Sequence, residues 1–354
     1  MAEYLLYTEQ SGSQAIPDLE ALNFAEEGFF WLDIRNPSYT DLRLLYEKLP
    51  IHPLTIEDIQ LGESREKCES YTQYLFLSVQ LLEEETFYGK LHTPSINDSV
   101  QMEMMAGGEW PSCYILVFRH CLVSLHCMPL PFLPSVLNRR LVNSRTALTG
   151  DWLAYILLDE IVDDFTRQGT LLQAEVDAIE DLTLTLGRFD QLDMLRRIYA
   201  AHRRTTILTR LIQPKLDVVR SLSKSASVAP FLLPRTLLYL RDVQDHLYSL
   251  LQQLVIFRES LDQSHDHYLG QADIELALAG HRMNVTVKKI TAITFMIGSA
   301  MAISSIMGMN VRVPFEGFNS EPALARLLPF LILMGGMGAV ITFVFIFGRY
   351  KHWF

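Results

Sequence analysis

The distribution of apolar residues separates the C-terminal end of the chain from everything before it. Only two segments are apolar over a length that could cross a bilayer, residues 290–307 and 327–347. The residues before position 290 mix charged side chains with short apolar runs, and they are numerous enough to bury a core of their own. The pattern predicts a soluble domain followed by two transmembrane helices.

Within the soluble part, strand-like runs come first and helical periodicity follows. The predicted strands lie in FFWLDI (29–34), YLFLSVQLL (74–82), SVQMEMM (99–105) and CYILVFRHCLVSLHC (113–127). From residue 152 the apolar spacing is helical, with interruptions expected at Pro214 and over residues 223–234. A last helix is expected to start near Pro234 and to run unbroken into the membrane, although Gly270 and Gly280 weaken it locally.

Charges beside the apolar segments predict the side of the membrane on which each end lies. Arg282, Lys288 and Lys289 precede the first span, and Arg349 and Lys351 follow the second, so both flanks are expected in the cytoplasm. The start MAEYLLYTEQSGSQ lacks a basic region and a long apolar stretch, so no cleavable signal peptide is expected. We therefore expect an integral protein of the cell (inner) membrane with cytoplasmic N- and C-termini.

Together these patterns predict six segments and an α/β cytoplasmic domain linked to membrane helices. They are a cytoplasmic α/β domain (1–148), cytoplasmic antiparallel helices (149–233), a stalk helix (234–307) that continues into the first span (290–307), an extracytoplasmic loop (308–326), a second span (327–347) and a basic cytoplasmic tail (348–354).

The charge balance and the cysteines narrow the classes of partner. A formal net charge of −11 argues against nucleic acid, because phosphate binding needs clustered Lys and Arg. The acids gather on a helical pattern, where a solvated face and a surface that concentrates cations are both open. They are Asp159, Glu160, Asp163, Asp164, Glu175, Asp177, Glu180 and Asp181. The four cysteines contain no Cys-x-x-Cys pair, so we expect buried apolar residues rather than disulfides or a zinc finger.

The first span carries a regular stripe of small and polar residues. One set recurs every seven residues, and a second set follows three residues after each member. Close helix packing through small residues is one explanation, and a water-lined pore is the other. Because two spans cannot enclose a pore, the second explanation predicts a symmetric ring of several chains. The stripe consists of Asn284, Val287, Thr291, Thr294, Gly298, Met301, Ser305 and Gly308.

Two other classes of function were weighed against a pore. The sequence contains no P-loop, Gly-x-Ser-x-Gly, His-Glu-x-x-His or paired Cys-His pattern, so it does not predict an enzyme, and it argues against a P-loop ATP-driven pump. A non-conducting membrane-anchored sensor or scaffold would use its spans only for attachment. Such an anchor has no need of Asn and Thr in a seven-residue register.

The end of the first span holds Gly308, Met309 and Asn310, followed by a short loop, a second span and a basic tail. In this arrangement the chain resembles the CorA family of divalent-cation channels. Further family signatures occur in their usual order, so the resemblance covers essentially the whole chain. They are WLDIRNP (31–37), HPLTIEDI (52–59), YLRDVQDHL (239–247), RMNVTVKKIT (282–291) and the ending RYKHWF.

This resemblance implies a CorA-like homopentamer in which one long stalk helix from each chain lines a central pore and the second span forms an outer ring in contact with lipid. Gly308, Met309 and Asn310 would form the selectivity filter, with Asn284 near the inner end of the pore. Asp242 falls where the family places an acid that senses cations between subunits, with an intrasubunit salt bridge as the alternative. Glu83, Glu84 and Glu85 lie in the region that supplies its partners, with a charged loop as the alternative.

The cargo stays open among Mg²⁺, Zn²⁺, Co²⁺ and Ni²⁺, and no covalently bound cofactor is expected. Mg²⁺ keeps its waters, so a ring of Asn310 carboxamides could select it without carboxylate ligands. Met307 stands where an aromatic residue is common, and Arg312 offsets the loop acids Glu316 and Glu321, so the outer mouth is nearly neutral. The zinc-transporting branch departs in the same places. His265 and His267 offer softer ligands, although residues two apart point to different helix faces.

Overall fold

The computed structural model describes residues 2–8, 12–17, 19–20, 28–88, 110–130, 133, 149–185, 191–224, 231–308 and 323–350. They belong to two compact units, Met1–Asp266 and His267–Phe354. Met309, Asn310, the strand predicted at 99–105, nearly all of the loop 308–326 and the tail from 351 lie outside the described residues.

The first unit contains a seven-stranded sheet in the order β2-β1-β3-β7-β6-β5-β4. Its strands are β1 (Glu3–Thr8), β2 (Gly12–Ile16), β3 (Phe30–Arg35), β4 (Lys67–Ser70), β5 (Tyr74–Gln80), β6 (Ser112–Phe118) and β7 (Cys121–His126). Only β3 and β7 pair in parallel, and every other neighbouring pair is antiparallel. The long run at 113–127 thus forms a hairpin of two strands, β6 and β7, in which every residue is buried.

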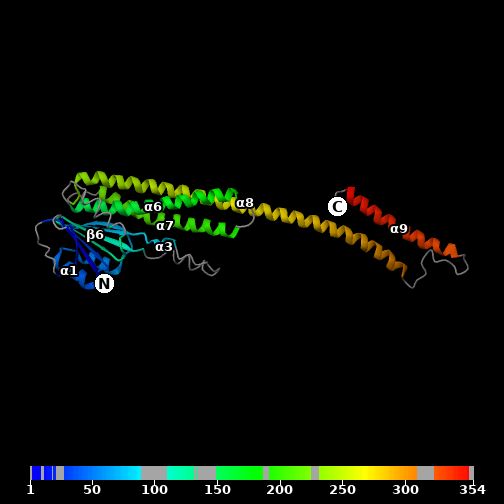
Figure 1. Cartoon of the computed structure of the whole chain (residues 1–354), viewed down its shortest axis with the longest axis horizontal. Helices are drawn as coiled ribbons and strands as arrows, with labels where there is room; N and C mark the ends of the chain where they lie inside the picture. The colour runs from blue at the N-terminus through cyan, green and yellow to red at the C-terminus, as the bar shows by residue number, and fades with distance from the viewer. Residues whose placement is uncertain are drawn as a thin grey trace. The chain divides into compact units, whose positions relative to one another are not determined.

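Helices cover both faces of this sheet. Alternate strand residues such as Leu75 and Leu77 pack against α6 (Gly150–Thr185) and α7 (Gln191–Lys224), whereas Tyr74 and Phe76 face the layer of α1 (Tyr39–Lys48) and α2 (Pro53–Leu61). Figure 1 shows α6 and α7 running along one side of the sheet and α1 on the other. The result is a three-layer α/β domain, as the sequence predicts.

The helix interruption expected at Pro214 is absent. Helix α7 continues through this proline, and the described helices α6 and α7 are bounded instead by Thr185 and Gln191. Proline inside a helix costs about 3 kcal/mol. Burying Leu211, Ile212 and Leu216 beside it, at about 1.5–3 kcal/mol each, outweighs that cost.

The cysteines are free, but they are not uniformly buried as predicted. Cys113 and Cys121 are buried in the sheet, Cys68 is half-buried, and Cys127 is exposed. Cys127 follows the last residue of β7, His126, so it lies in the turn outside the sheet.

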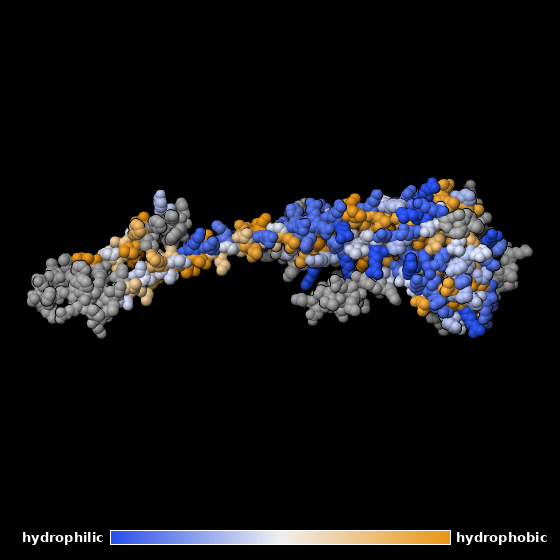
Figure 2. Space-filling view, turned by 180° about the vertical axis from the view of Figure 1, so that it is seen from behind, coloured by the Kyte–Doolittle hydropathy of each residue, from blue (hydrophilic) through white to orange (hydrophobic). Residues whose placement is uncertain are grey.

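The longest element is α8 (Pro234–Met307), and α9 (Ala323–Tyr350) follows it. Among the described residues, one helix is long and apolar enough to cross a membrane, the stretch Pro234–Ala302 of α8, while Met334–Phe343 of α9 is a shorter apolar segment. Figure 2 shows that hydrophilic side chains dominate the surface of the first unit, whereas apolar side chains are frequent along the described part of the second.

Candidate cation sites

The polar stripe of α8 occupies one exposed side of the helix. Asn284, Thr291, Gly298 and Ser305 are exposed, as are the second-set residues Val287, Thr294 and Met301. Ala292 is buried, and Met296 and Ala300 are half-buried beside Met337 and Ile341 of α9, where an apolar groove of about 470 Å³ lies between the two helices. At about 100° per residue, the first set of the stripe (Asn284, Thr291, Gly298 and Ser305) points away from this α9-facing side, whereas Met301 of the second set lines the groove. The first set therefore lies on a side of α8 that its own α9 leaves open.

The stripe presents oxygen acceptors to whatever occupies that side. The Thr291 hydroxyl donates to the Val287 carbonyl at 2.8 Å, which orients it and leaves its oxygen lone pairs outward. The helix ends at Met307, and the N–H of the next residue, Gly308, donates to the carbonyls of Ser304 (3.1 Å) and Ser305 (3.2 Å). Met309 and Asn310 lie outside the described residues, so the filter stays a prediction.

A second candidate site lies between α6 and α8 in the first unit. Asp159 and Asp163 of α6 and His246 of α8 each offer one ligand atom, and these three atoms lie within 4.8 Å of one another. The two aspartates are four residues apart, so they share one helix face. Asp159 is buried, Asp163 half-buried and His246 exposed, which places the group at the rim of the helix interface. Carboxylates suit Mg²⁺, and the imidazole adds affinity for Zn²⁺ or Ni²⁺.

Asp242 lies one helical turn before His246 and is exposed on the same side of α8. It makes no hydrogen bond or ion pair with any residue that the structure describes, so the intrasubunit salt bridge weighed above is absent there. The carboxylate of Asp242 thus extends the surface formed by Asp159, Asp163 and His246. We call these four residues the α6–α8 acidic site.

Among the glutamates at 83–85, Glu83 lies in the loop that was one alternative for them, whereas Glu84 and Glu85 belong to a helix. Glu84 begins a short helix, α3 (Glu84–Tyr88), and its Oε1 accepts from Gln168 Nε2 of α6 at 3.1 Å, while Glu83 accepts from the Thr86 hydroxyl. Burial raises the pKa of the neighbouring Asp164 carboxyl, Arg167 opposes this shift, and the charge of Glu84 adds to it. The described side chains Glu83 and Glu84 therefore gather at the α3-facing side of α6, and the structure does not group them with Asp242.

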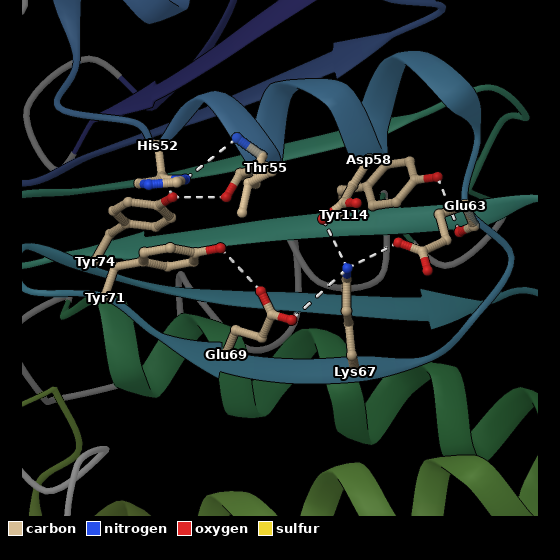
Figure 3. A network of polar contacts seen from close by, with 10 residues as sticks. His52, Thr55, Asp58, Glu63, Lys67, Glu69, Tyr71, Tyr74 and Tyr114 are labelled. Carbon is tan, nitrogen blue, oxygen red and sulfur yellow. Dashed lines mark hydrogen bonds and ion pairs between the residues drawn. The ribbon is translucent and has the colours of Figure 1, made fainter.

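A third acidic cluster already contains its own cation. Lys67 Nζ lies 2.7 Å from Asp58 Oδ2, 2.8 Å from Glu63 Oε2 and 3.7 Å from Glu69 Oε1. Figure 3 shows this lysine at the centre of the network. Although burial lowers the pKa of Lys67, its hydrogen bonds to Asp58 and Glu63 raise it above the usual range. An ammonium with three carboxylate neighbours fills the place a metal would take, so this cluster holds α2 to β4 rather than binding an ion.

Sequence reasoning missed the α6–α8 acidic site as a unit. The sequence places Asp159 and Asp163 in an acidic helix and Asp242 at a family position, but it predicts no role for His246. The available signal was the four-residue spacing on both helices, Asp159 to Asp163 and Asp242 to His246. What no single helix reveals is that α6 and α8 lie side by side.

Comparisons with known proteins agree with this architecture. A family model described as "CorA-like Mg2+ transporter protein" matches residues 26–349. The candidate metal ion transporter C17A12.14 of Schizosaccharomyces pombe is 32% identical over 82% of this chain and 46% of its own length. Magnesium transporter ALR1 of Saccharomyces cerevisiae is 29% identical over 82% of this chain and 37% of its own length. This chain therefore spans less than half the length of these fungal relatives.

The fold is shared along the whole chain with a solved structure. The complete structure of the CorA magnesium transporter from Methanocaldococcus jannaschii superposes with a TM-score of 0.62 at 18% identity, covering 100% of this chain and 99% of that one. The match includes the sheet domain, the long helix α8 and helix α9. By the family model and this shared fold, the chain belongs to the CorA-like Mg²⁺ transporter family.

Proposed function

We propose that the chain conducts divalent metal cations across the cell membrane, with Mg²⁺ as its main cargo, along a path lined by the polar stripe of α8. The observation that carries this proposal is the exposure of Asn284, Thr291, Gly298 and Ser305 on the side of α8 turned away from α9. Polar groups in a bilayer need partners, and water with hydrated ions supplies them. The names of the family and of ALR1 support Mg²⁺.

Several copies are needed to close such a path, because two membrane helices per chain leave the stripe open on one side. Five copies follow from the family resemblance, with each α8 contributing one stripe. Asn310 would then form a ring of carboxamides at the entrance, accepting hydrogen bonds from the waters that Mg²⁺ retains. The membrane potential would drive the ion inward, at roughly 4.6 kcal/mol per divalent ion for each 100 mV.

Gating is proposed to depend on the α6–α8 acidic site and on Asp242 in particular. A like-charge pair about 4 Å apart costs about 4 kcal/mol at an effective dielectric near 20, before screening. A bound cation would remove this repulsion and hold neighbouring copies together. When internal Mg²⁺ falls, the emptied sites would favour loosened states in which the Val287 and Ile290 levels widen and rewet.

Zn²⁺ is the second candidate cargo, and one residue, His246, favours it. His246 adds an imidazole to the α6–α8 acidic site, and imidazole binds Zn²⁺ far better than it binds Mg²⁺. The histidines at 265 and 267 add less. His265 packs against the Tyr199 ring with a centroid distance of 5.8 Å, and His267 is exposed. A non-conducting sensor would keep the acidic site but would have no use for the stripe.

Uptake into liposomes tests the proposal. The purified full-length protein is reconstituted with a trapped Mg²⁺-sensitive or Zn²⁺-sensitive dye, alongside Asn310→Ala and the matched loop variant Asn319→Ala. We expect rapid Mg²⁺ uptake by the parent and by Asn319→Ala, and loss of selective uptake in Asn310→Ala with the oligomer intact. Absence of divalent uptake by the parent would leave the sensor alternative, and normal selectivity in Asn310→Ala would remove Asn310 from the filter.

A further inference from the structure

The parallel strand pair at the centre of the sheet contains a row of buried polar side chains that lies outside the candidate cation sites. The Trp31 indole N–H donates to Ser124 Oγ at 2.8 Å, and the Ser124 hydroxyl donates to Asp33. His126 Nε2 lies 3.0 Å from Asp33 Oδ2 and 3.1 Å from Oδ1. Asp33, Ser124 and His126 are 3%, 0% and 2% exposed, so water reaches none of them. Such groups must find all of their hydrogen bonds within the protein.

The second ring nitrogen of His126 also faces an oxygen. Its Nδ1 lies 2.6 Å from the Met128 carbonyl oxygen. A neutral imidazole carries a single N–H, so it could satisfy only one of these two acceptors and would turn a lone pair toward the other. An imidazolium donates to both. The contacts of His126 therefore fit its protonated form, balanced by the Asp33 carboxylate.

The other charged groups around His126 are arranged so that they leave this pair intact. Arg35, its register partner on β3, directs its guanidinium to Glu3 of β1 at 2.9 Å. Cys113, opposite on β6, has a thiol whose pKa is raised by burial and by Asp33, so it stays uncharged. From α6, Asp164 borders the segment after His126, and Glu160 is buried on the same helix.

These neighbours set the direction of titration. Although burial lowers the pKa of His126, its hydrogen bond to Asp33 and the Asp33 charge raise it above the usual value, with Arg35 opposing them. A raised pKa means that the stabilisation is fully present below about pH 6.5, the ordinary histidine pKa, and is lost as pH rises through the higher folded value.

The Met128 carbonyl, which faces Nδ1 of His126, connects these buried polar side chains to the helical layer. Met128 begins a short segment that also contains Pro129 and Leu130, and all three line a small cavity with Ile161, Asp164 and Phe165 of α6. His126, the last residue of β7, thus contacts through one backbone carbonyl a segment that packs beside α6.

We propose that His126 is a proton-dependent latch, which as an imidazolium ties β3, β7 and the segment 128–130 together and which opens when it loses its proton. On deprotonation one acceptor, the Met128 carbonyl or the Asp33 carboxylate, loses its donor in a site without water. The segment then separates from α6 beside Asp164. The latch does not depend on the transport proposal, since it rests on contacts within the first unit alone.

Thiol labelling of the full-length protein in lipid nanodiscs tests this latch. Cys113 lies directly opposite His126, whereas the equally buried Cys121 lies on the other face of the sheet. Labelling rates of the two are followed by peptide mass spectrometry from pH 6 to pH 9, and their ratio cancels the intrinsic pH dependence of thiolate reactivity. Each unit by which the latch raises the His126 pKa makes opening about tenfold more frequent at high pH. We expect the Cys113 to Cys121 ratio to rise as the pH is raised from 6 to 9.

Three variants complete the test, two that alter the His126–Asp33 pair and one control. His126→Gln and Asp33→Asn should give a ratio that does not change with pH, whereas His120→Gln, in the exposed turn of the same hairpin, should follow the parent. A flat ratio in the parent overturns the proposal by itself, even where a variant does not fold. So does a pH-dependent ratio that persists in His126→Gln.

Discussion

The two parts of helix α8 differ in what covers them. In the first part, apolar residues recur at three- and four-residue intervals and are buried in the core of the first unit. They are Leu240, Val243, Leu247, Leu250, Leu254, Phe257 and Leu261. In the second part, from 267 on, Ala292 is the one buried residue among those whose burial is described. Large apolar side chains there are open, such as Val287 at 49% and Phe295 at 64% exposure.

The two parts of this continuous helix thus have different patterns of apolar and polar residues. The first part follows the rule of a soluble amphipathic helix, whose apolar stripe is satisfied by its own chain. The second part carries apolar residues around most of its circumference and a polar stripe on one side, which is the reverse arrangement. In the proposed function, lipid and neighbouring copies cover the apolar area, and water meets the stripe.

The largest expected effect sharpens the first half of this comparison. Leu247→Ala removes a fully buried side chain of the first part, and we expect it to lower the free energy of unfolding by about 2–5 kcal/mol. Ile256→Ala, at a position of the same part that is 60% exposed, should change it by less than about 0.5 kcal/mol. Urea unfolding followed by tryptophan fluorescence measures both. Equal losses would mean that neighbouring copies cover Ile256 as fully as the core covers Leu247.

An intermediate effect is expected at the α6–α8 acidic site. Asp242→Ala should raise the Mg²⁺ concentration that protects the cytoplasmic domain from protease by about tenfold, the usual scale for losing a supporting carboxylate. Glu259→Ala is the matched control, because Glu259 is an exposed acid of the same helix that lies more than three turns beyond His246. If both variants need the parent's Mg²⁺ concentration, Asp242 has no sensing role.

The smallest effect contrasts two glycines. A Cβ at Gly280, in the second part of α8, would meet nothing within 4 Å, so Gly280→Ala should slow local hydrogen exchange by stabilising the helix by about 0.5–1 kcal/mol. A Cβ at Gly169 of α6 would lie 2.5 Å from Leu250 Cδ1, in the first part of α8, so Gly169→Ala should destabilise the first unit. The two substitutions must therefore change stability in opposite directions. A destabilising Gly280→Ala would show that another surface packs closely there.

The sequence predicted the long-period features of this fold and missed those that depend on short segments. The buried strands β3, β5, β6 and β7 and the extent of α8 follow from apolar runs. β4 has only four residues, two of them Lys67 and Glu69, so its pairing comes from its neighbours. The interruption predicted at Pro214 is absent because the burial of its flanking residues outweighs the low helix propensity of proline.

The polar residues of the candidate sites also differ in how far the sequence predicts them. The polar stripe was predicted because a seven-residue register is written along one helix. The grouping of Asp159 and Asp163 with His246, and the pairing of Asp33 with His126, join residues more than eighty positions apart, and only the packing of separate elements brings them together.

Water access along the second part of α8 tests the central claim most directly. Single cysteines replace stripe residues (Thr291→Cys, Gly298→Cys, Ser305→Cys) or α9-facing residues (Met296→Cys, Ala300→Cys) in the full-length protein in liposomes. A charged, membrane-impermeant thiol reagent is then read out on the membrane peptides. We predict labelling of the three stripe positions, slowed by millimolar Mg²⁺, and protection of the other two. Labelling that ignores this division, or stripe positions that never react, would contradict a water-filled path lined by α8.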